Sequence, residues 1–176
     1  MEEYKITMHN EEDAILNTYS ELTECCPEVD VIVINDASTD DTQRILLENH
    51  IPHVTLPTNL GIGGGVQTGY KYAFENGYDI AVQLDGDGQH CPSEVIKIVT
   101  PVQNGECDMA VGSRFITNEG FQSSALRRMG INMLSALISM CTKQRIHDCT
   151  SGFRAVNRKF IEILIMHRII QSLRLL

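Results

Sequence analysis

The sequence predicts an α/β fold in which helices cover both faces of a mostly parallel sheet. Two largely apolar runs, Val29–Ile34 and Ile80–Leu84, have the composition of strands that are buried on both faces. Segments with a helical spacing of apolar residues alternate with such runs, an order typical of parallel sheets. Polar residues and glycines follow the runs directly. Because ligands collect at the carboxyl ends of the strands in such sheets, we expect the functional residues there.

The first half of the chain alternates strand and helix patterns. A strand should precede the first helix, but only the stretch Tyr4–Met8 is available and polar residues interrupt it, so we expect a short first strand. After the second strand, a polar turn offers Ser38, Thr39 and Asp40 as caps for the next helix. The other predicted elements of this half are a helix at Glu11–Glu24, a strand at Val29–Ile34, a helix ending near Asn49 and a strand at His53–Leu56.

The second half continues the same alternation. The glycines of Gly61–Gly65 predict a turn that leads into a helix, and Asn76-Gly77 is a good C-terminal stop for that helix. The remaining predicted elements are a strand at Ile80–Leu84, a helix at Ser93–Val102, a strand at Met109–Val111, and helices at Leu126–Met140 and Arg158–Leu173. We therefore expect a single domain over residues 1–176.

Composition narrows the class of protein. The net charge of −9 argues against general nucleic-acid binding, which requires a basic surface. The acidic N-terminus lacks the pattern of a signal peptide, and no stretch is long and uncharged enough for a membrane span. The six cysteines include no Cys-x-x-Cys pair and are interpreted as reduced thiols. These features predict a cytoplasmic location.

The segment after the strand Ile80–Leu84 carries the main chemical signal. Asp85 and Asp87 stand two residues apart, with glycines between and after them, so that both carboxylates can turn toward one point while a ligand approaches closely. Paired carboxylate oxygens suit Mg²⁺ or Mn²⁺ carrying a phosphorylated substrate. The alternative is an acidic turn that caps the helix beginning at Ser93-Glu94.

Two further segments follow predicted strands. Asp36 follows the strand Val29–Ile34 and could accept hydrogen bonds from a nucleotide. The alternative is that the polar turn around Asp36 only caps the next helix. Backbone N–H groups of Asn59–Gly65 could cradle a phosphate at a helix start, but a tight turn with close packing explains the glycines as well. The segment departs from both the Gly-x-Gly-x-x-Gly and the Walker patterns.

Arginines and one late acidic segment complete the candidates. Arg114 lies just past a predicted strand, and Arg127-Arg128 opens a later helix. The planar guanidinium suits phosphate, although single arginines are more often solvated surface charges. In the segment 146–154, Asp148 could orient a substrate or act as a base, or could pair with Arg154 in a turn.

Together these motifs resemble glycosyltransferase family 2 with the GT-A fold, a Rossmann-like three-layer sandwich, and within it the dolichyl- or polyprenyl-phosphate sugar synthase branch. The matching pieces occur in the order of the family: Asn10-Glu11-Glu12, Val33-Ile34-Asn35-Asp36-Ala37-Ser38-Thr39-Asp40, Asn59-Leu60-Gly61, Leu84-Asp85-Gly86-Asp87-Gly88-Gln89-His90, Gly112-Ser113-Arg114-Phe115 and Asp148-Cys149-Thr150-Ser151-Gly152-Phe153-Arg154.

The resemblance implies an inverting, metal-dependent transfer of a sugar from a nucleoside-diphosphate sugar to an acceptor, expected to be a polyprenyl phosphate in cell-envelope polysaccharide synthesis. It implies association with a membrane surface or a partner subunit. The implied donor-site residues are Glu11, Asp36, Asp85 and Gly86, the implied ligands of Mg²⁺ or Mn²⁺ are Asp85, Asp87 and Gln89, the implied acceptor-phosphate residues are Arg114, Arg127 and Arg128, and the implied catalytic carboxylates are Asp148 and Asp87.

The chain departs from the family pattern in three places. Thr7-Met8-His9 stands where the family has proline, a small residue and tyrosine, and Asn35 replaces the first of two aspartates. The basic Arg…Gly…Ser-Lys segment that follows in the family is absent from residues 155–176. We therefore expect a domain truncated at both ends, with a short first strand and a missing C-terminal portion.

Two alternatives remain at this stage. A nucleotidyltransferase of related fold would use the metal for attack on a nucleotide phosphate, but its N-terminal loop rich in glycine and basic residues is absent. A non-catalytic fragment or partner subunit would bind the nucleotide sugar without transfer. A glycosidase is disfavoured because its two carboxyl groups must lie about 5–10 Å apart across a sugar.

Overall fold

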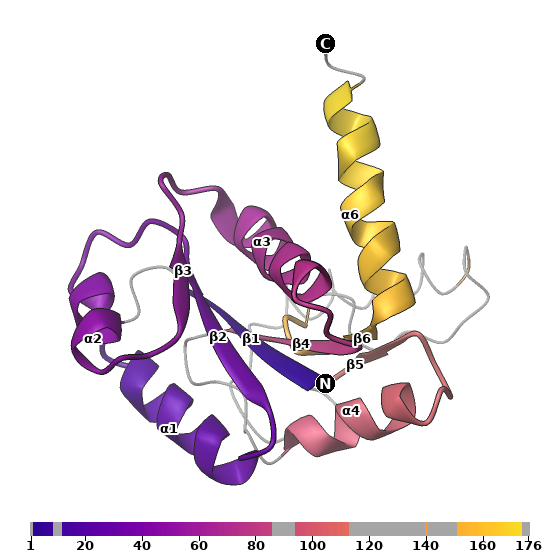
Figure 1. Cartoon of the computed structure of the whole chain (residues 1–176), viewed down its shortest axis with the longest axis horizontal. Coiled ribbons are helices and arrows are strands. Elements are labelled where there is room, and N and C mark those ends of the chain that lie inside the picture. Colours follow the sequence, from indigo (N-terminus) through magenta and orange to yellow (C-terminus); the bar gives the residue numbers. More distant parts are fainter. Residues whose placement is uncertain (1, 9–11, 86–93, 113–139, 141–150, 174–176) are drawn as a thin grey trace.

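The structure is a computed structural model of the chain and describes residues 2–8, 12–85, 94–112, 140 and 151–173 (Figure 1). These residues form an α/β arrangement around one twisted sheet. Its elements are β1 (Glu2–Met8), α1 (Ile15–Cys25), β2 (Asp30–Asn35), α2 (Thr42–Glu48), β3 (His53–Thr55), α3 (Gly61–Glu75), β4 (Ile80–Asp85), α4 (Val95–Gln103), β5 (Met109–Val111), β6 (Arg154–Asn157) and α6 (Arg158–Leu173).

The described sheet has six strands in the order β3-β2-β1-β4-β6-β5. Strands β1 to β4 pair in parallel, whereas β6 runs antiparallel to both β4 and β5. The prediction of a mostly parallel sheet is therefore confirmed. Each parallel connection passes through a helix, as a parallel crossover requires.

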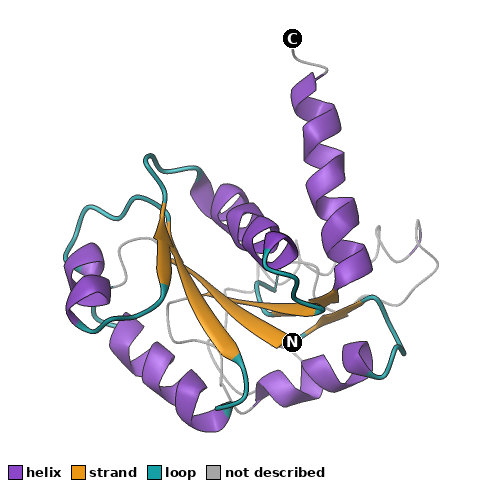
Figure 2. Cartoon of the chain, in the orientation of Figure 1, coloured by secondary structure: helices purple, strands orange, loops and turns teal. Residues whose placement is uncertain are grey.

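The helices cover both faces of the sheet, so the protein has the three layers predicted (Figure 2). On one face, α1, α2 and α4 bury a cluster that includes Ile15, Leu46 and Val99 against β2 and β4. On the other face, α3 and α6 pack through Tyr70 and Ile161 against β4 and β6. Burial of both faces explains why β2 and β4 are apolar over most of their length.

The first strand is longer than the sequence predicts. Strand β1 has seven residues, Glu2–Met8, and pairs with β2 on one side and β4 on the other. The expected interruption by polar residues does not end the strand, because two parallel neighbours satisfy its backbone hydrogen bonds along its length. The first helix begins at Ile15, four residues later than the predicted start at Glu11.

The glycine segment is part of a helix and not the turn before it. Helix α3 begins at Gly61, whose φ of 71° is in the left-handed region that favours glycine. A Cβ atom at Gly64 would collide with the side chain of Leu60. Gly64 and Gly65 are both buried, and the missing side chain of Gly64 leaves room for Leu60 at the start of the helix.

Strand β6 is the element that the sequence did not predict. One of the two alternatives for this segment was a turn in which Arg154 pairs with Asp148, but Arg154 is the first residue of β6 and pairs with Gln83 and Val111 in the sheet. The strand has only four residues and polar ends, so its local pattern is weak. Insertion between β4 and β5 buries Ala155 and Val156 completely and stabilises it. The predicted helix Leu126–Met140 lies outside the described residues except for Met140.

Candidate functional site

The register of the sheet brings the ends of β2 and β4 to the same edge. Thr7 of β1 pairs with Ile34 on one side and with Asp85 on the other. Ile34 and Asp85 are therefore level, about 9–10 Å apart across two strand spacings. Asp36 follows Ile34 by two residues. The expectation that Asp36 and Asp85 lie at one carboxyl edge of the sheet is confirmed at the level of the backbone.

Asp36 is a buried carboxylate with a defined partner. Its side chain is 2% exposed, and its Oδ1 accepts a hydrogen bond from the backbone N–H of Leu60 at 2.7 Å. Leu60 immediately precedes α3. The contact therefore fixes the start of α3 against the end of β2, beside the edge where the strand ends meet.

The backbone reverses sharply just after β2. The N–H of Ala37 donates to the carbonyl of Asn35 at 2.9 Å, and Ala37 has a φ of 54°. An alanine in the left-handed region is strained by about 1 kcal/mol. Such strain persists only where neighbouring contacts hold it, and here the N–H of Ser38 donates to Oδ1 of Asn35 at 3.0 Å.

Asn35 holds this turn from inside the protein. Its side chain is 0% exposed, and its Nδ2 donates to Oε1 of Gln43 at 2.7 Å. The same Gln43 oxygen accepts a hydrogen bond from the hydroxyl of Thr55, which lies opposite Asn35 in the β2–β3 register. An aspartate, which the family pattern has at this position, would place an acceptor against the Gln43 oxygen. The contact explains why an asparagine fits here.

His53 extends the same chain of hydrogen bonds. Its Nδ1 lies 2.7 Å from the carbonyl oxygen of Ile51, which can only accept, so Nδ1 carries the proton. Its Nε2 lies 3.3 Å from Nε2 of Gln43 and accepts from that amide. The hydrogen bonds therefore all run in one direction, from Ser38 through the three side chains to Ile51. The backbone N–H of Ser38 at one end can only donate, and the carbonyl of Ile51 at the other end can only accept. Sequence reasoning missed Gln43 and His53 because their only signal is this contact across β2, α2 and β3.

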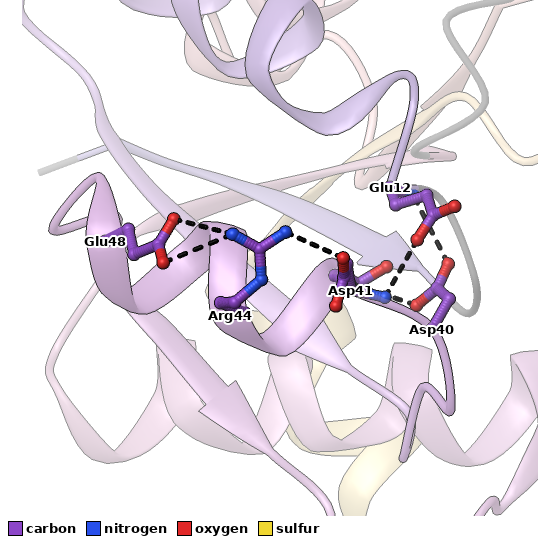
Figure 3. A network of polar contacts seen from close by, with 6 residues as sticks. Glu12, Asp40, Asp41, Arg44 and Glu48 are labelled. Carbon is purple, nitrogen blue, oxygen red and sulfur yellow. Dashed lines mark hydrogen bonds and ion pairs between the residues drawn. The ribbon is translucent and has the colours of Figure 1, made fainter.

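A second network ties the start of α2 to the segment before α1 (Figure 3). The N–H of Asp41 donates to Oε2 of Glu12 at 2.8 Å, and the N–H of Glu12 lies 3.4 Å from Oδ2 of Asp40. Asp40 also accepts from the N–H of Thr42, the first residue of α2, at 3.1 Å, while the N-cap position itself is Asp41, whose side chain makes no capping hydrogen bond. Arg44 pairs with Asp41 and Glu48 along the exposed face of α2.

Hydrogen bonding decides the charge state of this network. Burial raises the pKa of the Asp40 carboxyl, but the hydrogen bonds that it accepts from Thr42 and Glu12 outweigh burial and lower the pKa overall. The hydrogen bond from Arg44 and the charge of Arg44 lower the pKa of Asp41. Both carboxylates therefore remain ionised at neutral pH.

The structure also joins two motifs that lie far apart in the sequence. The N–H of Gly112 donates to the carbonyl of Phe153 at 2.9 Å, and a Cβ atom at Gly112 would collide with the Phe153 ring. The Nε of Arg154 donates to the carbonyl of Ser151 at 2.7 Å, and Ser151 is completely buried. The two motifs therefore meet beside β4.

Most predicted site residues lie outside the part of the chain that the structure describes. These residues are Glu11, Gly86, Asp87, Gln89, Arg114, Arg127, Arg128 and Asp148. Asp85 is described through its backbone, as the last residue of β4. Among the described residues, no three His, Cys, Asp or Glu side chains cluster to hold a metal ion. Carboxylate and amide oxygens of Asp85, Asp87 and Gln89 would suit Mg²⁺ or Mn²⁺, and this metal site stays a prediction.

The chain has the GT-A fold, as its likeness to solved structures shows. Glucosyl-3-phosphoglycerate synthase from Mycobacterium tuberculosis, solved with UDP, superposes with a TM-score of 0.68 at 22% identity, over 90% of this chain and 57% of that chain. The same synthase, solved with Mn²⁺ and UDP-glucose, superposes with a TM-score of 0.68 at 20% identity, again over 90% of this chain and 56% of that chain. At this identity the likeness shows the fold.

The chain belongs to glycosyl transferase family 2, whose sequence model matches residues 6–164. A UDP-N-acetylglucosamine–dolichyl-phosphate N-acetylglucosaminyltransferase of Methanococcus voltae is 30% identical, over 90% of this chain and 70% of its own length. A polyprenol monophosphomannose synthase of Mycolicibacterium smegmatis is 28% identical, over 89% of this chain and 62% of its own length. An undecaprenyl-phosphate mannosyltransferase of Micrococcus luteus is 30% identical, over 85% of this chain and 63% of its own length.

These comparisons confirm the resemblance to the polyprenyl-phosphate branch of the family. The chain spans between 62% and 70% of the length of these three curated relatives. Within the described helices, none combines the length and the apolar character needed to cross a membrane.

Proposed function

We propose that the chain binds a nucleoside-diphosphate sugar and a divalent metal, and that it transfers the sugar to a polyprenyl phosphate with inversion. The shared carboxyl edge of Asp36 and Asp85 is the observation that carries the proposal. The names of the relatives, which include transferases to dolichyl and undecaprenyl phosphate, support the acceptor class.

The donor would lie along the carboxyl edge of β2, β1 and β4. In this proposal Asp36 contacts the nucleoside, with Glu11 and Gly86 in the same site, and Asp85, Asp87 and Gln89 hold Mg²⁺ or Mn²⁺ on the diphosphate. When bound, the metal neutralises the charge that grows on the leaving diphosphate. The buried turn around Asn35 would keep Asp36 in place for the nucleoside.

The acceptor phosphate would contact Arg114, Arg127 and Arg128. A lipid phosphate has a second pKa of about 6 and is mostly ionised at neutral pH, so it needs little help from a base. Positioning by arginine would then matter more than proton removal. Asp148 is the proposed catalytic carboxylate, together with Asp87. A membrane-bound acceptor would place the protein at the cytoplasmic face of a membrane, alone or with a partner subunit.

Calorimetric titration of UDP and of GDP, first with Mn²⁺ and then with EDTA, tests the donor site. We expect one nucleotide to bind with Mn²⁺ and to lose at least tenfold in affinity with EDTA. Asp87→Asn should lose the metal-dependent part of the affinity, and Asp79→Asn, at the other end of β4, serves as the matched control. Equal affinity with Mn²⁺ and with EDTA would contradict the metal assignment.

Transfer requires a separate test, because the chain spans only part of the length of its relatives. Radiolabelled UDP- and GDP-sugars should label farnesyl phosphate and leave farnesol unlabelled. Metal-dependent binding without transfer to any acceptor would favour the alternative of a non-catalytic nucleotide-sugar-binding fragment or partner subunit. Release of pyrophosphate from a nucleoside triphosphate would favour the nucleotidyltransferase alternative.

A further inference from the structure

A pocket of about 490 Å³ lies between α3 and α6, on the sheet face opposite α1 and α4. Figure 1 shows these two helices on the same side of the sheet, above β4 and β6. Val66 of α3 and Phe160 and Leu164 of α6 form apolar walls. We call this space the α3–α6 pocket. Its volume is in the range of small-molecule sites.

The floor of the α3–α6 pocket is polar. Gln83 of β4 and Arg154 of β6 line it, together with Tyr70 of α3. Gln83 and Arg154 are directly paired in the antiparallel β4–β6 register, so their side chains emerge on the same face of the sheet. An apolar pocket with a few convergent polar groups is the usual form of a ligand site.

Gln83 is the informative residue of this floor. Its side chain is 4% exposed, and among the residues that the structure describes its amide has no hydrogen-bond partner. Native proteins pair nearly all buried polar groups, because a buried amide without a partner is destabilising. The neighbouring Ala81, two residues earlier on the same face of β4, is packed in the apolar core. An apolar side chain would therefore suit position 83 better if packing alone decided it.

The other floor groups define the charge of a matching ligand. Arg154 is positively charged, and its Nε is held on the carbonyl of Ser151 at 2.7 Å, so the position of the guanidinium is fixed. Tyr70 is 4% exposed, and burial raises its pKa to about 12 while the charge of Arg154 acts in the opposite direction. Tyr70 is thus a neutral hydroxyl at physiological pH. The amide of Gln83, unpartnered among the described residues, can donate hydrogen bonds, so the ligand group beside it should accept, and the charge of Arg154 favours an anion in the pocket.

We propose that the α3–α6 pocket binds an amphipathic anion, with a phosphate or carboxylate on Gln83 and Arg154 and a hydrocarbon part against Val66, Phe160 and Leu164. This site is additional to the proposed donor and acceptor sites, with which it shares no described lining residue. A lipid phosphate and a fatty acid share the required chemistry, and the two are distinguished by experiment.

Calorimetry with farnesyl phosphate and with decanoate tests the pocket, with farnesol, decanol and inorganic phosphate as controls. We expect at least one of the two anions to bind at least tenfold more tightly than its alcohol and than inorganic phosphate. Preference for farnesyl phosphate would identify a lipid phosphate as the ligand, and preference for decanoate a fatty acid. Equal affinity for each anion and its alcohol would overturn the proposal.

Gln83→Met separates a ligand-binding role from a structural one. Methionine has a similar length and needs no hydrogen bonds, so we expect the melting temperature to rise by about 2–6 °C while the anion affinity falls at least tenfold. Gln103→Met, at an exposed position on α4, is the matched control and should change neither quantity. A lower melting temperature in Gln83→Met, or unchanged anion affinity, would contradict the proposal. Titration of UDP into the same variants reports on the donor site, and transfer of the sugar to farnesyl phosphate by Gln83→Met reports on the acceptor site at Arg114, Arg127 and Arg128, so the two proposals can fail independently.

Discussion

The Oδ1 atom of Asp36 accepts a hydrogen bond from the backbone N–H of Leu60 at 2.7 Å, although 24 residues separate the two in the sequence. The bond joins the end of β2 to the start of α3 and occupies one oxygen of a carboxylate that is almost completely buried. The residue that sequence motifs assign to nucleotide binding therefore also stabilises the fold at the proposed site.

This double role can be separated by two substitutions at Asp36. Asp36→Ala removes the acceptor of the part-buried hydrogen bond from the N–H of Leu60, and we expect the free energy of unfolding to fall by about 1–3 kcal/mol. Asp36→Asn keeps an acceptor oxygen but removes the charge, so it should be more stable than the alanine variant and still bind nucleotide weakly. Urea unfolding and calorimetry with UDP and GDP measure the two effects. Equal stability of the two variants would contradict the structural role of the bond.

Asn35 should not tolerate the aspartate that the family pattern has at this position. In Asn35→Asp, a carboxylate oxygen faces Oε1 of Gln43, and we expect a loss of about 1–3 kcal/mol in the free energy of unfolding. Asn59→Asp is the control, because the Asn59 side chain is exposed and its Oδ1 accepts from Gly61, as a carboxylate oxygen can. Equal losses of unfolding free energy in the two variants would contradict the prediction that contact with Gln43 disfavours aspartate at position 35.

The direction of the hydrogen bonds around Gln43 also determines the tautomer of His53. We expect neutral His53 to carry its proton on Nδ1, since the carbonyl of Ile51 can only accept and Nε2 accepts from Gln43. Long-range ¹H–¹⁵N correlation spectra of the imidazole distinguish the two tautomers. Gln43→Leu removes the donor to Nε2 and should increase the Nε2–H population, whereas an Nε2–H tautomer in the wild type would contradict the assigned network.

The pH dependence of stability should include a contribution from Asp40. Although burial raises its pKa, the hydrogen bonds from Thr42 and Glu12 lower that pKa in the folded state. A lowered folded-state pKa stabilises the fold above the unfolded value of about 3.9, and this contribution is lost as the pH falls through the folded value. We expect Asp40→Asn to have a shallower loss of stability than the wild type between about pH 5 and pH 2. Urea unfolding measured across this range is the test, and parallel curves would contradict it.

The contact between Gly112 and Phe153 should be sensitive to one added methyl group. Gly112→Ala places a Cβ atom against the Phe153 ring, and we expect a loss of about 1–3 kcal/mol in the free energy of unfolding. Gly112→Ala combined with Phe153→Leu should recover part of the loss, because the smaller side chain makes room. A double-mutant cycle measures this coupling, and strict additivity would show that the ring is not the obstacle.

Local patterns located the described helices and parallel strands, although α1 begins four residues later and β1 two residues earlier than predicted. Strand β2 lies within one residue of its predicted bounds, because an apolar run ending in Asn35-Asp36 combines a buried strand with a turn signal. The same pattern failed for β6, whose four residues carry little periodicity of their own. It also misplaced Gly61–Gly65, because glycine indicates a turn locally, whereas here Gly64 permits close packing against Leu60 within the first turn of α3.

By itself, the sequence determined the alternation of strands and helices, the family and the edge of the sheet where Asp36 and Asp85 end their strands. These features depend on residue spacing along one segment, which is visible without the fold. Only the tertiary structure decided which donor meets which acceptor: Asn35 with Gln43, His53 with Ile51, and Asp36 with Leu60. It also decided that Gln83 faces the α3–α6 pocket instead of the apolar core. The physical reason is that a hydrogen bond needs two groups within about 3 Å, and sequence periodicity places one group on a face without naming its partner.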